Sequence, residues 1–114
     1  AAALVNIGDV KLVAARIDDA DAAMLRDALD KAKERVGSGV VLLASVVDGK
    51  VALVAGVTKD LVGRFKAGEV VNVAAKEVGG KGGGRPDMAQ AGGTNPAALP
   101  AALDSVRGWV EQRL

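Results

Sequence analysis

Apolar residues in the first third of the chain form one short continuous run and then one helically spaced series. Residues 10–17 are apolar and rich in β-branched side chains, which predicts a buried strand, although the periodicity alone does not exclude a helix. The next apolar positions recur three to four residues apart and predict a helix with one buried face: Met24, Leu25, Ala28, Leu29, Ala32 and Val36. Three carboxylates, Asp18, Asp19 and Asp21, suit the positive end of that helix dipole, and Gly37 supplies a stop signal.

The second third begins with two apolar runs that flank a tight turn. Residues 40–47 are almost continuously apolar, which is typical of a strand buried on both faces. Asp48-Gly49 is a preferred two-residue hairpin turn because both positions tolerate positive φ, and residues 51–57 form the returning strand.

The remainder of the chain predicts three more helices and one polar segment. Thr58 can cap a short helix over 58–65, and Glu69 opens a second helix that ends at Gly79. Residues 79–95 are polar and hold seven of the 15 glycines, so they predict a long loop. A last helix begins near Leu99, because Pro100 is tolerated close to a helix N-terminus. The expected architecture is a single α/β domain with a small mixed β-sheet, a β-hairpin, about four covering helices and a long glycine-rich loop.

The composition excludes several kinds of site. The chain has no cysteine and no histidine, which removes thiolate metal sites, disulfides and any histidine-based catalysis. We therefore expect neither catalytic nor metal-binding residues. The formal net charge is +1, yet residues 50–85 carry seven cationic against three acidic side chains, a local balance of +4. A local basic patch is either a solvated face or the footprint of a modest nucleic-acid binder.

The glycine-rich segment resembles no common nucleotide-binding loop. A dinucleotide fingerprint that starts at Gly80 would need glycine in place of Arg85 and a preceding strand, and a triphosphate-binding loop would need Ser or Thr after Lys81. What remains is a backbone with exposed N–H groups beside cations, which can approach a phosphate or a base closely. Arg85 either contacts an anion or pairs with Asp87 to shape the segment.

Residues 82–93, Gly-Gly-Gly-Arg-Pro-Asp-Met-Ala-Gln-Ala-Gly-Gly, resemble the C-terminal signature of bacterial alanyl-tRNA synthetases. The resemblance extends to residues 48–51 and 54–57 and covers essentially all of residues 1–114. It implies that residues 1–114 are a C-terminal, DHH-associated tRNA-binding domain. The catalytic domain, the editing domain and the long helical segment of that family are not part of these residues. Residues 1–3 are a possible tail of that helical segment. The same type of domain occurs in DHH phosphoesterases, where a histidine stands at the position of Arg85.

The resemblance implies that the chain binds the outer corner of tRNA(Ala) and so supports aminoacylation and editing by a cytoplasmic enzyme. The expected RNA-binding residues are Lys76, Gly79, Gly80, Lys81, Gly82, Gly83, Gly84, Arg85, Asp87 and Gln90. No cofactor is expected in this domain, and ATP and metal ions belong to the other parts of such an enzyme. No membrane or DNA partner is expected, and self-association is expected to be weak. The alternatives are a protein interaction or dimerisation module and the nucleic-acid-binding domain of a DHH-type phosphoesterase.

Overall fold

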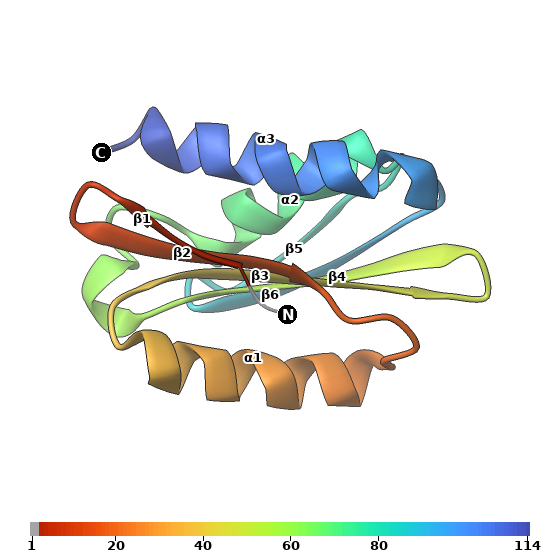
Figure 1. Ribbon diagram of the computed structural model, residues 1–114, viewed down its shortest axis with the longest axis horizontal. Helices are drawn as coiled ribbons and strands as arrows, with labels where there is room; N and C mark the ends of the chain where they lie inside the picture. The colour runs from red at the N-terminus through yellow and green to blue at the C-terminus, as the bar shows by residue number, and fades with distance from the viewer. Residues whose placement is uncertain (1–2) are drawn as a thin grey trace.

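A computed structural model describes residues 3–114 as one six-stranded mixed sheet with helices on both faces (Figure 1). The strand order across the sheet is β1-β2-β3-β4-β6-β5. The strands are β1 (Ala3–Ile7), β2 (Val10–Arg16), β3 (Gly39–Val47), β4 (Lys50–Val57), β5 (Gly82–Gly84) and β6 (Met88–Gly93). The helices are α1 (Ala22–Val36), α2 (Ala67–Glu77) and α3 (Leu99–Glu111), with single 3-10 turns η1 (Lys59–Leu61) and η2 (Pro96–Ala98). The predicted α/β class and mixed sheet are confirmed.

A β-α-β unit forms the first half of the fold. Strands β2 and β3 are parallel, and α1 connects them. The Asp21 carboxylate accepts a hydrogen bond from the Met24 N–H at 2.8 Å and caps α1, as the acidic cluster before the helix predicts. At the other end Gly37 adopts a φ of 72° and its N–H returns to the Lys33 carbonyl oxygen at 3.1 Å.

The predicted hairpin is confirmed as β3 and β4, which pair antiparallel from Val40–Val57 to Val47–Lys50. The turn residues Asp48 and Gly49 have φ values of 53° and 74°, the left-handed region that a tight hairpin turn requires. Strand β3 is buried over most of its length because helices cover both faces of the sheet at this position.

Three elements differ from the sequence-based expectation. The helix predicted over 58–65 is only the 3-10 turn η1, because the Thr58 hydroxyl accepts the Gly39 N–H instead of capping a helix. Strand β1 was not predicted. Residues 1–3 were interpreted as the tail of a helical segment, but Ala3 belongs to β1. Ala1 and Ala2 lie outside the described residues. The prediction of a long loop is wrong, because residues 79–95 contain the β5–β6 hairpin, whose strand β6 pairs with β4.

The core lies in two layers, one on each face of the sheet. Helices α2 and α3 pack against each other above the sheet, and α1 lies alone below it (Figure 1). The larger layer is centred on the fully buried Phe65, whose ring lies 6.0 Å from that of Trp109. The smaller layer joins α1 to β2, β3 and β4 through Leu25, Leu29 and their neighbours. Within the larger layer, α2 is the helix that packs on both strands of the β5–β6 hairpin.

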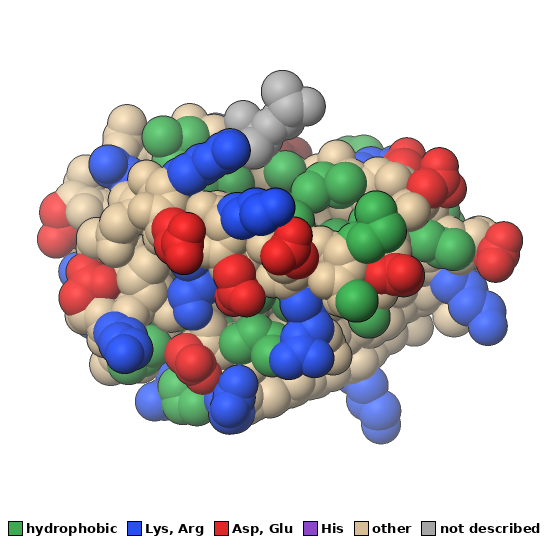
Figure 2. Space-filling model, turned by 90° about the horizontal axis from the view of Figure 1, so that it is seen from below, with side chains coloured by type: hydrophobic (Ala, Val, Ile, Leu, Met, Phe, Trp, Pro, Cys, Tyr) green, Lys and Arg blue, Asp and Glu red, His purple; other side chains and the backbone are tan. Residues whose placement is uncertain are grey.

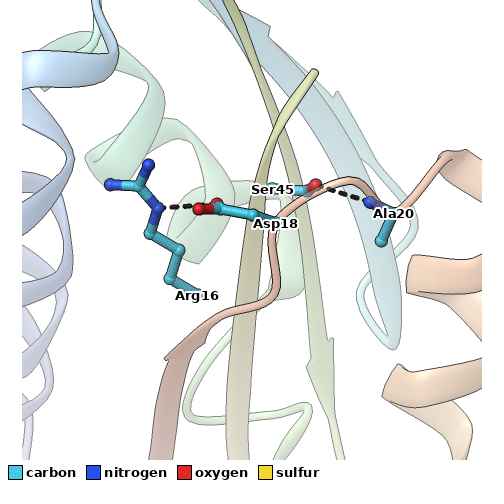
Figure 3. Close-up of polar contacts among 4 residues, drawn as sticks. All are labelled: Arg16, Asp18, Ala20 and Ser45. Carbon is cyan, nitrogen blue, oxygen red and sulfur yellow. Dashed lines mark hydrogen bonds and ion pairs between the residues drawn. The ribbon is translucent and has the colours of Figure 1, made fainter.

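The segment between β2 and α1 is held by two polar contacts (Figure 3). Arg16 Nε donates to Asp18 Oδ1 at 2.7 Å on the surface. The Ala20 N–H donates to the buried Ser45 hydroxyl at 3.0 Å, which ties the segment to β3. Of the two contacts, the buried Ser45 bond is the one that anchors the entrance of α1 to the sheet.

Candidate nucleic-acid interface

The β5–β6 hairpin forms one end of the sheet, and α2 packs over it. Strand β5 is an edge strand, and its three glycines pair with Ala91, Gln90 and Ala89 of β6. The Gly82 N–H donates to Asn72 Oδ1 of α2 at 3.1 Å, and the Ala67 N–H at the start of α2 donates to the Pro86 carbonyl oxygen at 2.9 Å. Helix α2 therefore runs along β5 and is joined to it at both ends of the strand.

Close backbone packing explains most glycines of this hairpin. A side chain on Gly80 would overlap the Gly92 carbonyl oxygen, and one on Gly82 would overlap Ala91 and the Gln90 carbonyl oxygen. A Cβ on Gly84 would lie 2.8 Å from Ala89 Cα, closer than real side chains approach. Gly79 ends α2 with a φ of 73°. These glycines are thus required by the fold itself, with or without a ligand.

Gly83 is different from the other glycines of the hairpin. A Cβ added there meets no atom within 4 Å, its φ is not positive, and the residue is exposed. Internal packing therefore does not explain the absence of a side chain at Gly83. An exposed stretch of backbone without a side chain allows an external group to approach closely.

Gly83 borders a shallow depression of about 310 Å³ between β5 and the first turns of α2. The depression is lined by Lys66, Gly68, Glu69, Asn72, Gly83, Gly84, Arg85 and Pro86. Its cationic side chains are Lys66 and Arg85, both exposed, and its acidic side chain is Glu69. The two cations outnumber the one carboxylate, so the lining of the depression carries a net positive charge.

Arg85 forms a loose contact with Asp87. Arg85 Nε lies 3.7 Å from Asp87 Oδ1, and the two side chains are 72% and 50% exposed. An exposed ion pair at this distance contributes little to stability, so it leaves the guanidinium free to bind another anion. The Asp87 backbone has a separate structural role, because its carbonyl oxygen accepts the Val57 N–H at 3.1 Å and Lys33 Nζ at 3.4 Å. Both alternatives raised by the sequence for Arg85 are compatible with this geometry.

Seven of the ten predicted binding residues fall into two groups along the edge of the sheet. Gly83, Gly84 and Arg85 line the depression at the start of α2. Lys76, Gly79, Gly80 and Lys81 lie at the end of α2, where the Gly80 N–H donates to the Ala75 carbonyl oxygen at 2.9 Å. Ten residue steps separate Lys66 from Lys76, which corresponds to about 15 Å along the helix axis. We call this surface the α2–β5 strip: Lys66, Gly68, Asn72, Lys76, Lys81, Gly83, Gly84 and Arg85.

Gln90 lies outside the strip, whereas three residues of the strip were not predicted. Gln90 is exposed on β6, where it pairs in register with Gly83. Lys66, Gly68 and Asn72 were not predicted from sequence, because the glycine-rich segment was expected to be a free loop and its contact with α2 was not foreseen. The signal for Lys66 was present in the basic stretch, but that stretch alone does not identify which cations lie together.

Over residues 3–114 no group of three or more Asp, Glu, His or Cys side chains is placed to hold a metal ion. No helix in that range is both long enough and apolar enough to cross a membrane.

Comparisons with known proteins agree on one family. The sequence pattern of the DHHA1 domain matches residues 9–112. The chain is 59% identical over 110 residues to the alanine–tRNA ligases of Aromatoleum aromaticum, Dechloromonas aromatica and Burkholderia thailandensis. The match covers 96% of this chain and 13% of each ligase, so the chain spans about an eighth of these relatives.

Two solved structures share the fold. The C-Ala domain of Aquifex aeolicus alanyl-tRNA synthetase superposes with a TM-score of 0.89 at 31% identity, covering 96% of this chain and 98% of that one. A DHH-domain protein described as a member of the s1p family of ribosomal proteins superposes with a TM-score of 0.66 at 15% identity. It covers 98% of this chain and 28% of that protein, and at this identity the likeness concerns the fold alone.

Proposed function

Because this chain belongs to the DHHA1 domain family and, within it, to the C-terminal domains of alanine–tRNA ligases, we propose that it binds tRNA along the α2–β5 strip. The protein that contains such a domain would be an ATP-dependent aminoacyl-tRNA synthetase. Its ATP and metal sites would lie outside these 114 residues, and this domain would supply binding without catalysis. The absence of histidine and cysteine from the sequence is consistent with that division.

The observation that carries the proposal is the gathering of four cations along one strip, with exposed glycine backbone at one end of it. Lys66 and Arg85 line the depression beside Gly83, and Lys76 and Lys81 lie at the other end of α2. Phosphate groups supply most of the affinity in nucleic-acid complexes and are bound by such cations. The backbone at Gly83 offers a surface on which a sugar or a base can rest closely.

The part of the tRNA that we propose as the ligand is the outer corner of the L-shaped molecule. Unstacked or terminal bases are available at such a corner, and proteins recognise RNA mostly through bases of this kind and through phosphates. By holding the corner, the domain would keep the acceptor end within reach of the aminoacylation and editing sites of a cytoplasmic enzyme. We propose at most weak self-association and no DNA partner for the domain itself.

Hydroxyl-radical footprinting of tRNA(Ala) with this chain tests the proposal. We expect protection at the outer corner, and Lys76→Ala and Lys81→Ala should weaken that protection at constant salt. Arg26→Ala provides a matched control, since Arg26 is an exposed cation on α1, on the opposite face of the sheet. Protection confined to the acceptor stem, or equal protection by all variants, would contradict the proposal.

A further inference from the structure

A second candidate site lies on the face of the sheet that carries α1. An apolar groove of about 410 Å³ runs between α1 and the β1–β2 end of the sheet. Its apolar lining comes from Val13 and Ala15 of β2, Leu43 of β3, and Ala28, Ala32 and Val36 of α1. The groove shares no residue with the α2–β5 strip.

The groove follows from covering a wide sheet with one helix. Six strands spaced about 4.8 Å apart extend over about 24 Å, whereas one helix with its side chains is about 10–12 Å wide. Helix α1 packs on β3 and β4, so the β1–β2 end of this face lacks a helix of its own (Figure 1). The side chains that α1 places beside this end include Ala28 and Ala32, which are too small to fill the space.

Large apolar side chains are exposed at the margin of the groove. Leu4 of β1 is 53% exposed and Ile17, just after β2, is 39% exposed, and both line the groove. Figure 2, which looks onto α1, shows apolar side chains reaching the surface between charged ones. Apolar surface that is gathered around a groove in this way is typical of an interaction site.

The charged lining of the groove is entirely cationic. It consists of Lys11, Arg16, Lys31 and Arg35, and no carboxylate lines the groove. Arg16 pairs with Asp18 at 2.7 Å and Lys31 pairs with Asp27 at 3.1 Å. Within residues 3–114, Lys11 and Arg35 form no ion pair. These two cations lie at one end of the groove, because the start of β2 and the end of α1 meet beside Gly39.

We propose that this groove binds an acidic amphipathic helix of a partner protein. From Ala28 to Val36 the wall formed by α1 extends about 12 Å, the length of two helical turns. A helix that presents apolar residues at positions i, i+4 and i+7 fits a groove of this length. Carboxylates beside its apolar stripe complement Lys11 and Arg35. RNA suits the groove less well, because its backbone brings phosphates but few apolar groups to contact Val13 and Leu43.

The test uses a lactam-stapled helical peptide with Leu at i, i+4 and i+7 and Glu at the flanking positions. A control peptide carries the same Leu residues with Lys in place of Glu. The C-Ala domain that covers 96% of this chain forms a solved structure by itself, so the 114-residue chain is a suitable sample. Fluorescence anisotropy gives the affinity, and amide chemical shifts identify the residues that contact the peptide.

We expect the Glu peptide to shift residues 11–17 and 28–36 and the Lys peptide to bind at least about tenfold more weakly. Ala32→Trp fills the groove and Arg35→Glu reverses a cation, so each should weaken the Glu peptide by about tenfold or more. The matched controls, Ala23→Trp and Arg26→Glu, alter exposed positions of α1 that do not line the groove and should bind like the parent.

Three results would overturn the proposal. The first is equal binding of the two peptides, or shifts that lie outside the groove. The second is a concentration-dependent dimer whose shifts coincide with the groove, which would make a second copy its occupant. The third is displacement of the peptide by tRNA, which would assign the groove to RNA. The first two results do not depend on whether tRNA binds at the α2–β5 strip.

Discussion

The buried hydroxyl of Ser45 accepts a hydrogen bond from the Ala20 N–H at 3.0 Å, joining β3 to the entrance of α1 across 25 residues (Figure 3). Ser45→Ala leaves this N–H without its partner in a buried environment. We expect the free energy of unfolding to fall by about 1–3 kcal/mol, measured by urea denaturation. Ser105→Ala is the control, since its hydroxyl donates to Glu77 at the surface and its loss should change stability by about 0.5 kcal/mol or less. An equal effect at both positions would contradict the structural role of Ser45.

Gly82 and Gly83 are neighbours that should respond oppositely to the same substitution. Gly82→Val forces a side chain against Ala91 and should lower stability by about 1–3 kcal/mol or more. Gly83→Val enters open space in an extended strand and should leave the melting temperature unchanged or slightly raised. Gly83 pairs with Gln90, which pairs with Val54 of the α1-side core, so a side chain at position 83 points to the face of the sheet that carries α1. Gly83→Val should therefore weaken tRNA binding only if RNA wraps around the β5 edge onto that face. A folded Gly83→Val domain that binds tRNA like the parent would exclude RNA from that side of the edge.

Arg85→Ala tests the charge on the strip. If Arg85 contacts a phosphate, the slope of log affinity against log salt should become shallower by about 0.7–0.9, and all RNAs should weaken to a similar extent. Arg26→Ala is the control, because Arg26 is an exposed cation on α1, on the opposite face of the sheet. An unchanged slope combined with lower stability would mean that Arg85 shapes the turn with Asp87 instead of binding RNA.

Two substitutions at Asn72 test the geometry and the charge of the strip separately. Its side-chain oxygen accepts the Gly82 N–H, so Asn72→Ala should increase hydrogen exchange at Gly82 and weaken tRNA binding together. Asn72→Asp keeps an acceptor for the N–H but adds negative charge beside Lys66 and Arg85. We expect protection at Gly82 to be retained in this variant while tRNA binding falls. Equal tRNA binding by the Asp variant and the parent would place the RNA elsewhere.

Asp60 should make stability depend on pH in the acid range. Hydrogen bonds from the Ser38 hydroxyl and then the Thr58 hydroxyl hold the pKa of its carboxyl below the usual value. A folded-state pKa that lies below the unfolded value of about 3.9 gives a stabilising contribution above that pH. The contribution is lost as the pH falls through the folded-state pKa. Chemical unfolding between about pH 6 and 2 should therefore show a smaller acid loss for Ser38→Ala than for the parent, and parallel curves would contradict this.

The parts of the fold that could be predicted from sequence have strong local signals. Helix α1 has an apolar stripe with Asp21 and Gly37 at its ends, and the β3–β4 hairpin has apolar runs on both sides of Asp48-Gly49. Strands β5 and β6 could not be predicted in this way, because glycine has a low intrinsic preference for strands. They form through pairing with β4 and through the Asn72 contact, both of which are tertiary.

The same limit applies to the candidate interface. Lys81 and Arg85 could be identified from sequence because they interrupt the glycine run. Lys66 could not be assigned to them, since it precedes α2 and reaches the same depression only after the helix packs on β5. The sequence likewise did not separate the glycines required by packing from Gly83, because this distinction depends on which backbone lies opposite each residue.

Strand β5 is an edge of the sheet, and an unprotected edge invites pairing with strands of other molecules. This edge is three residues long, with Lys81 before it and Arg85 after it. Short length and flanking cations are two means by which proteins prevent such pairing and the aggregation that follows. Two of the four cations proposed to attract RNA thus also protect the domain against aggregation when no RNA is bound. Variants that neutralise both of them should therefore be checked for solubility before a loss of RNA binding is interpreted.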